Sequence, residues 1–138
     1  MHIAKEFKFE AAHQLHDPSW TAEENFYVFG KCSHLHGHSY RIEVQVGHEV
    51  DPVKGWVMDY TDLKAIVNAA VIDRWDHQFL NEVPPWTDVP SLKTTAENIA
   101  LAAWPQIETE MQRKGFGYVL LERVRVSETA TTFAEVSR

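Results

Sequence analysis

Lys31-Cys32-Ser33-His34-Leu35-His36-Gly37-His38-Ser39-Tyr40 is the stretch around which we expect the rest of the chain to be organised. It holds three of the chain's eight histidines and its only cysteine. Random scatter explains such a grouping of infrequent residue types poorly. Histidine and cysteine bind zinc and take part in proton transfer. The stretch therefore marks the place where we expect the chemistry of the protein.

His36 and His38 lie two residues apart and lead into residues 39–46, where apolar and polar side chains alternate as in a half-buried strand. Side chains two apart on a strand point to the same face, so both imidazoles can converge on one point. Gly37 between them allows a close backbone approach. Two imidazoles form only part of a metal site. His34 lies two residues before His36 but precedes the alternation, so the pattern does not predict the direction of its side chain. The alternative interpretation of the His36–His38 pair is a solvated, histidine-rich turn.

A second predicted strand, residues 3–13, also ends in a histidine. Its apolar side chains Phe7, Phe9 and Ala11 share one face with His13. Taken alone, a histidine at the end of an apolar face is typical of a hydrogen-bonded core residue. Beside the histidine pair of the other strand, it completes a set of three imidazoles. Such a set with one open position keeps zinc catalytic, because the fourth position can take water or substrate oxygens.

Size and composition are those of an ordinary globular protein. With 138 residues and 15.9 kDa, we expect one domain over residues 1–138. The net charge of −7 argues against a nucleic-acid partner or an anionic membrane surface. The apolar runs are too short to span a bilayer, and the first residues lack a signal-peptide core. A single cysteine cannot form an internal disulfide, so we expect a cytoplasmic protein with a free thiol.

Two helices are predicted in the second half of the chain. Apolar residues at three- and four-residue spacing indicate a helix that Thr61 or Asp62 caps and that ends near Arg74. Thr94 and Glu97 fit a capping box at the start of the second helix.

Two further strands are predicted at residues 118–128 and 131–136, which are rich in β-forming residue types. The order strand, strand, helix, helix, strand, strand predicts an α+β fold, with two helices on one face of a four-stranded antiparallel sheet. Residues 56–60 are a candidate short strand. Residues 17–30 show no sustained period and are predicted to be a long functional loop that delivers Cys32 to the second strand.

Two further groups are candidates for proton transfer. Cys32 lies a few residues before His36 and can act as a base if it is a thiolate, or it can close the zinc site as a fourth ligand. Asp76 and His77 follow the first predicted helix and form a candidate acid/base pair. The alternative for this pair is charge at a helix C-terminus, where the dipole favours a histidine.

The whole chain resembles the 6-pyruvoyltetrahydropterin synthase / 6-carboxytetrahydropterin synthase family, whose fold is known as the tunnelling fold. The resemblance rests on several motifs that occur together, in the family's order, from position 9 to position 129. They are Phe9-Glu10-Ala11-Ala12-His13, Cys32 with Leu35-His36-Gly37-His38, Val57-Met58-Asp59-Tyr60-Thr61-Asp62-Leu63-Lys64, Asp76-His77 with Leu80-Asn81, Thr95-Ala96-Glu97-Asn98 and Glu128-Thr129.

The resemblance implies a zinc enzyme with defined site residues. Zinc is the implied cofactor, with His13, His36 and His38 as its ligands. Cys32 is implied to be the catalytic proton acceptor.

The other residues that the resemblance assigns are implied to transfer protons or to bind the substrate. Asp76 and His77 are implied to be a charge-relay pair. Glu128 resembles the carboxylate that anchors the pterin ring, a role that suits a group able to accept two parallel hydrogen bonds. Thr95 and Thr129 lie in the motifs implied to bind substrate.

The spacing from Cys32 to His36 resembles the family's carboxytetrahydropterin branch, which belongs to queuosine (7-deazaguanine) biosynthesis. That branch converts 7,8-dihydroneopterin triphosphate to 6-carboxy-5,6,7,8-tetrahydropterin and releases acetaldehyde and triphosphate. It implies a zinc-dependent carbon-oxygen and carbon-carbon lyase. Residues 23–31 instead resemble the 6-pyruvoyltetrahydropterin synthases, which eliminate triphosphate on the tetrahydrobiopterin route. A non-catalytic protein that binds metal or pterin is the alternative of another class.

The resemblance also implies a homo-oligomer, a tetramer or a hexamer, in which sheets join into a barrel and active sites lie at subunit interfaces. Open sheet edges, which favour pairing with another chain, fit this expectation. The expected partners are thus a small-molecule pterin triphosphate and further copies of the chain, with no nucleic acid and no membrane.

Overall fold

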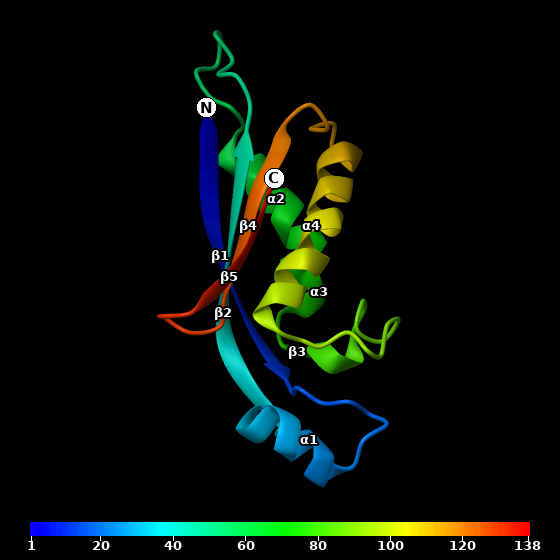
Figure 1. The fold of residues 1–138 in the computed structure, drawn as a ribbon. Coiled ribbons are helices and arrows are strands. Elements are labelled where there is room, and N and C mark those ends of the chain that lie inside the picture. Colours follow the sequence, from blue (N-terminus) through cyan, green and yellow to red (C-terminus); the bar gives the residue numbers. More distant parts are fainter.

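Two long antiparallel strands, β1 (His2–His13) and β2 (His36–Gly47), form the centre of the sheet in the computed structural model, which describes residues 1–138 (Figure 1). Their register runs from His2 opposite Gly47 to His13 opposite His36. Side chains alternate between the two faces along both strands, and the burial of every second residue follows that alternation. The two strands predicted from the alternating pattern are thus confirmed.

The sheet has five strands in the order β3-β1-β2-β4-β5. Strand β4 (Leu120–Ser127) pairs antiparallel with β2, and β5 (Phe133–Ser137) pairs antiparallel with β4. The predicted α+β class is confirmed, but the four-stranded antiparallel sheet is wrong. Strand β3 (Gln78–Phe79) pairs parallel with β1 and makes the sheet mixed. Two residues are too few to show a period, so the sequence pattern carried no sign of this strand.

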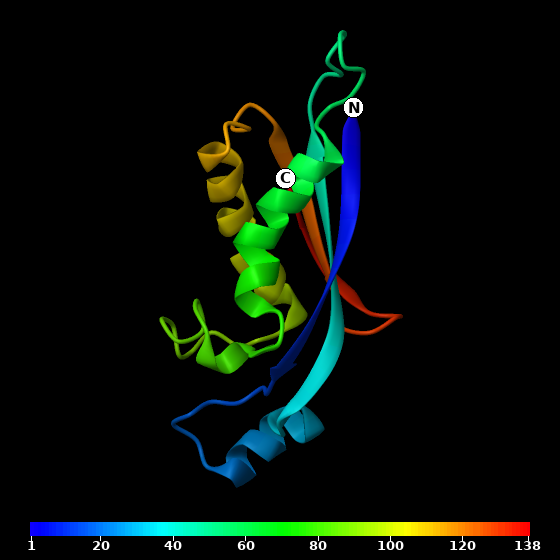
Figure 2. The same cartoon turned by 180° about the vertical axis from the view of Figure 1, so that it is seen from behind.

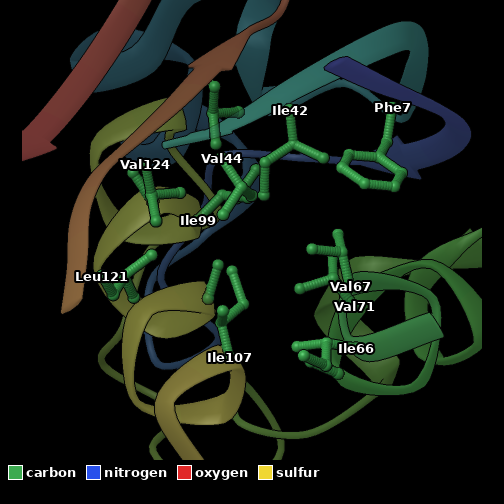
Figure 3. Close-up of a cluster of buried hydrophobic side chains, with 14 of the residues drawn as sticks. Phe7, Ile42, Val44, Ile66, Val67, Val71, Ile99, Ile107, Leu121 and Val124 are labelled. Atoms are coloured by element: carbon green, nitrogen blue, oxygen red, sulfur yellow. The ribbon is translucent and has the colours of Figure 1, made fainter. Parts of the chain in front are cut away.

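Helices cover one face of this sheet (Figures 1 and 2). Helix α2 (Tyr60–Val67) continues through a π-helical segment (Asn68–Ile72) into α3 (Asp73–Trp75), and α4 (Ala96–Arg113) lies beside them. Figure 3 shows the core between the two layers, with side chains of the sheet facing those of the helices. Each fully buried aliphatic or aromatic side chain stabilises the fold by roughly 1.5–3 kcal/mol.

The segment predicted to be a long loop contains a helix, so that prediction is wrong. Helix α1 (Ala22–Phe29) begins at a capping box formed by Thr21 and Glu24, and a 3-10 turn (Gly30–Ser33) connects it to β2. Its apolar residues are adjacent in sequence and largely exposed, so they produce no helical period. The helix lies at the end of the β1–β2 pair that is far from the N-terminus (Figure 1).

Both predicted helix caps are displaced, the first by two or three residues and the second by one. Asp59 caps α2 by accepting a hydrogen bond from the Thr61 backbone, and Thr95 caps α4 by accepting one from the Asn98 backbone. Residues 56–60 form a bend and the start of α2 rather than a strand. The predicted cap Thr94 is fully buried and has a different task, described below.

No helix covers the other face of the sheet (Figures 1 and 2). This face carries charged side chains. Arg123 pairs with Glu43, and Arg125 pairs with Glu135 at 2.8 Å. The sheet therefore separates an apolar, covered face from a polar, open one. No helix of the chain has the length and apolarity needed to cross a membrane.

Candidate active site

Three histidines meet at the end of the β1–β2 pair. Their ligand atoms, one from each of His13, His36 and His38, all lie within 4.8 Å of one another. The ring centroids are 4.5 Å apart for His13 and His36, 5.0 Å for His13 and His38, and 5.1 Å for His36 and His38. The register explains this, because His13 lies opposite His36 and Ala11 lies opposite His38, all with side chains on the covered face. The structure thus brings together the three imidazoles that the sequence singled out.

Backbone carbonyls fix two of the three rings. His13 donates from Nδ1 to the Thr94 carbonyl at 2.7 Å, and His36 donates from Nδ1 to the His34 carbonyl at 2.7 Å. Each bond leaves the lone pair on Nε2, and the buried Nε2 of His13 has no hydrogen-bond partner. A second ring nitrogen held by a backbone carbonyl is the usual support of a metal-binding histidine. These atoms therefore fit a divalent ion between the rings.

The electrostatics of the site also favour neutral imidazoles. The pKa of His13 is lowered to about 4, mainly by burial and in part by the positive charges that His36 and His38 would carry, although the hydrogen bond to the Thr94 carbonyl opposes the shift. Burial and His36 lower the pKa of His38 as well. A neutral imidazole has a free lone pair, so both rings are ready to bind metal at neutral pH.

Thr94 was not expected to belong to the site. Its side chain is fully buried, and its hydroxyl lies 3.2 Å from His13 Nδ1, beside the stronger bond to its carbonyl. The neighbouring Thr95, an expected substrate-binding residue, caps α4 directly behind it. No local sequence pattern marks Thr94 for this role, because the contact to His13 is made across 81 residues of the chain.

Glu128 follows β4 and continues its alternation of buried side chains on the covered face, after Val124 and Val126. Burial raises the pKa of the Glu128 carboxyl, and the Glu97 carboxylate at the start of α4 raises it further, while His36 opposes the shift. A carboxylate of the same chain therefore shares the face and the neighbourhood of the three histidines. Thr129, the next residue, is exposed and forms a hydrogen bond of 2.6 Å with Thr132.

Cys32 lies in the 3-10 turn before β2 and is exposed. Its carbonyl accepts a hydrogen bond of 2.7 Å from the Leu15 backbone, which ties the turn to the chain just beyond His13. Its sulfur is not among the ligand atoms that converge with the three imidazoles. The group that could hold a metal ion therefore consists of three imidazoles without the thiol.

Asp76 and His77 form a pair at the outer edge of β1. Asp76 Oδ2 lies 2.9 Å from His77 Nδ1, and Asp76 Oδ1 accepts a hydrogen bond of 2.9 Å from the Glu10 backbone. The His77 backbone donates to the Glu10 carbonyl at 2.6 Å. The Glu10 amide is the main reason that the pKa of Asp76 is lowered, and His77 adds to it. Asp76 is therefore held as a carboxylate that can orient the His77 ring.

The Asp76–His77 pair does not join the histidine cluster. The His77 side chain is 78% exposed, and its backbone has a left-handed φ of 60°, which non-glycine residues adopt infrequently. His77 borders an open hollow of about 500 Å³ that Glu10, Ser39 and His38 of the cluster also line. The side chains of Glu10 and Ser39 bond to each other on the uncovered face of the sheet. The acid/base pair thus faces outward from the chain that carries it.

Comparison with known proteins agrees with this arrangement. Residues 2–138 match the family model described as 6-pyruvoyl tetrahydropterin synthase. The human 6-pyruvoyl tetrahydrobiopterin synthase is 35% identical over 130 residues, covering 92% of this chain and 84% of the relative. A putative 6-carboxy-5,6,7,8-tetrahydropterin synthase of Archaeoglobus fulgidus is 37% identical over 120 residues, covering 87% of this chain and 90% of the relative.

The fold matches as well. The structure of Caenorhabditis elegans 6-pyruvoyl tetrahydropterin synthase superimposes with a TM-score of 0.85 at 28% sequence identity. The match covers 100% of this chain and 95% of that chain.

Proposed function

The chain belongs to the 6-pyruvoyl tetrahydropterin synthase family, and from that premise we propose that it is a zinc-dependent lyase that acts on 7,8-dihydroneopterin triphosphate. The observation that carries the proposal is the convergence of three imidazoles within 4.8 Å, with a carboxylate of the same chain beside them. This arrangement combines a metal centre with an anchor for a pterin ring. Neither part alone would identify a substrate.

The roles of the residues follow from their chemistry. His13, His36 and His38 would hold the zinc ion through neutral imidazole nitrogens. When bound, zinc supplies a Lewis acid that polarises the side-chain oxygens of the substrate. Glu128 accepts two parallel hydrogen bonds from the amino and ring N–H groups of the pterin, which fixes the substrate side chain over the histidine cluster.

Protons are moved by groups on either side of the substrate. Cys32 accepts a proton from the substrate side chain, a task that requires it to react as a thiolate. His77, oriented by Asp76 at 2.9 Å, gives or takes protons opposite the thiol. Thr95 and Thr129 lie beside Glu97 and Glu128 and complete the substrate-binding region.

We propose 6-carboxy-5,6,7,8-tetrahydropterin, the queuosine-route product, because three residues separate Cys32 from His36. The second candidate is 6-pyruvoyltetrahydropterin synthase activity. The relatives named 6-pyruvoyl tetrahydrobiopterin synthase favour it, since the human protein is 35% and the Drosophila melanogaster protein 36% identical to this chain. Both reactions start from the same substrate and use the same residues, so the product must be measured.

We further propose that the chain forms a homo-oligomer, a tetramer or a hexamer, in which a neighbouring chain supplies Asp76 and His77 to the histidine cluster. Three features support this. His77 faces outward, the outer edge of β1 is free over most of its length, and β5 forms the other edge of the sheet. Helix α1 also exposes neighbouring apolar side chains, of which Tyr27 is 90% accessible.

The test is to incubate the zinc-loaded protein with 7,8-dihydroneopterin triphosphate and to measure acetaldehyde and triphosphate. Acetaldehyde and triphosphate together indicate the carboxytetrahydropterin product, whereas triphosphate without acetaldehyde indicates the pyruvoyl product. A Cys32→Ala variant should lose turnover and keep its zinc. Failure of the unmodified protein to release either product would favour a non-catalytic metal- or pterin-binding protein.

A further inference from the structure

Tyr40 carries a buried hydroxyl that has no partner. Its side chain is 0% exposed, and its hydroxyl forms no hydrogen bond. The ring stacks on Phe9 at 5.0 Å and lies edge-on to His38 at 5.3 Å and to His13 at 5.9 Å. A buried hydroxyl without a partner costs about 1–3 kcal/mol of stability, and a phenylalanine would make the same ring contacts without that cost. The hydroxyl is therefore unexplained by packing.

The strand register places Tyr40 beside Glu128. Arg41 pairs with Ser127 in the β2–β4 ladder, so the next step of the same register sets Tyr40 opposite Glu128. Both side chains lie on the covered face, since Ile42 and Val126 form the buried pair two residues along. Side chains directly opposite on neighbouring strands have Cβ atoms about 4.5–5.5 Å apart. A phenolic donor thus stands next to a carboxylate acceptor.

The Glu128 carboxylate can accept a hydrogen bond from the Tyr40 hydroxyl in addition to those from a pterin ring. The pKa of Glu128 is shifted by burial and by neighbouring charges, and no hydrogen bond contributes to the shift. A tyrosine hydroxyl is protonated at neutral pH and can donate a hydrogen bond. A carboxylate has about four lone-pair positions, of which a pterin ring occupies two. At least one further position is therefore free to accept a hydrogen bond from the Tyr40 hydroxyl.

We propose that Tyr40 is a positioning residue, whose hydroxyl donates a hydrogen bond to the Glu128 carboxylate when the pterin binds and holds the carboxylate in the orientation that grips the pterin ring. This rests on the proposed function, in which Glu128 anchors that ring. The bond would fix one oxygen of the carboxylate and leave the other lone pairs directed at the substrate. It would also link the pterin anchor to the strand that carries His36 and His38.

The test is a double-mutant cycle on pterin binding by the zinc-loaded protein, with neopterin fluorescence as the signal. Tyr40→Phe is expected to weaken neopterin binding about tenfold, the loss typical of one hydrogen bond to a charged group. In a Glu128→Ala background the same change is expected to have no further effect, because the acceptor of the hydrogen bond is already absent. Tyr118→Phe, the same change at an exposed tyrosine, is the matched control and should leave binding unchanged.

Thermal unfolding separates positioning from packing. Because the hydroxyl has no structural partner, Tyr40→Phe should melt at the same temperature as the unmodified chain or higher, and should keep one zinc ion per chain. Equal losses of affinity in both backgrounds, unchanged affinity, or a lower melting temperature with lost zinc would each overturn the role of Tyr40. If the unmodified chain itself binds no neopterin, the proposed function fails together with this inference.

Discussion

The histidine cluster and the Asp76–His77 pair are two groups of candidate site residues that the fold places in opposite ways. The cluster lies on the covered face of the sheet, where His13 is 2% exposed and held by the Thr94 carbonyl. The pair lies at the outer edge of β1, where the His77 side chain is 78% exposed and borders an open hollow. One region is complete within a single chain, and the other offers its groups outward.

This difference is consistent with separate roles for the two regions, metal binding for the cluster and proton transfer for the pair. Metal binding needs several lone pairs held in fixed directions, which the paired strands β1 and β2 provide through their register. Proton transfer needs a group that reaches the substrate from another side. A chain that exposes such a group away from its own metal centre is suited to serve the centre of a neighbour.

The largest effect is expected from removing a member of the cluster. His13→Ala should reduce bound zinc to near zero and lower turnover by at least ~1000-fold, because two imidazoles are insufficient to retain the ion. Metal analysis and the product assay measure both quantities. His48→Ala, at an exposed histidine away from the cluster, is the control and should change neither. Full zinc occupancy in His13→Ala would show that the ion lies elsewhere.

The outward-facing pair should affect turnover without affecting metal. His77→Ala is expected to lower turnover by about 100- to 10,000-fold while zinc content stays constant, because the proposed role of His77 is proton transfer and not metal binding. If each site combines the cluster of one chain with the pair of another, co-assembly of His13→Ala and His77→Ala chains should restore activity to about a quarter of normal. Mixed assemblies with no activity would place both groups in the site of one chain.

The stability of the metal-free protein should fall as the pH drops below that of a neutral solution. Burial lowers the pKa of His13 from 6.5 to about 4, so the unfolded chain binds a proton in this range and the folded chain does not. Stability is therefore fully present above about pH 6.5 and falls as the pH drops towards 4, by on the order of 3 kcal/mol. Urea unfolding of the metal-free protein at a series of pH values measures this loss of unfolding free energy. A His13→Gln variant should lose most of the pH dependence.

The smallest predicted effect is a gain of stability. Burial and Glu97 raise the pKa of Glu128, so the charged carboxylate is unfavourable in the folded chain at neutral pH. Its contribution to stability is present at acidic pH and lost as the pH rises through the folded pKa. Glu128→Gln should therefore raise the melting temperature by roughly 1–3 °C while it weakens pterin binding. Glu49→Gln, at an exposed position, should change neither, and a lower melting temperature for Glu128→Gln would contradict the expectation.

The parts of the fold that follow a regular period were predictable from the sequence. Alternation along residues 39–46 and 3–13 fixed two strands, their faces and the phase of the three histidines. The geometry of the cluster followed, because the side-chain period of a strand is two and a paired strand supplies the third imidazole.

The parts that depend on distant contacts were not predictable in the same way. Thr94 contributes a backbone carbonyl to His13 from 81 residues away, which no local pattern encodes. Strand β3 consists of two residues that pair only because β1 is beside them. Helix α1 keeps its apolar residues exposed, so it lacks the core-facing period by which helices are found in sequences.

The measurement that tests the account most directly is X-ray absorption at the zinc edge of the loaded, active protein. The account predicts one zinc ion per chain, coordinated by three imidazole nitrogens and by oxygen from water or substrate. Change of His13, His36 or His38 to alanine should abolish the signal. A sulfur neighbour at about 2.3 Å would instead identify Cys32 as a ligand and the centre as a closed, structural one.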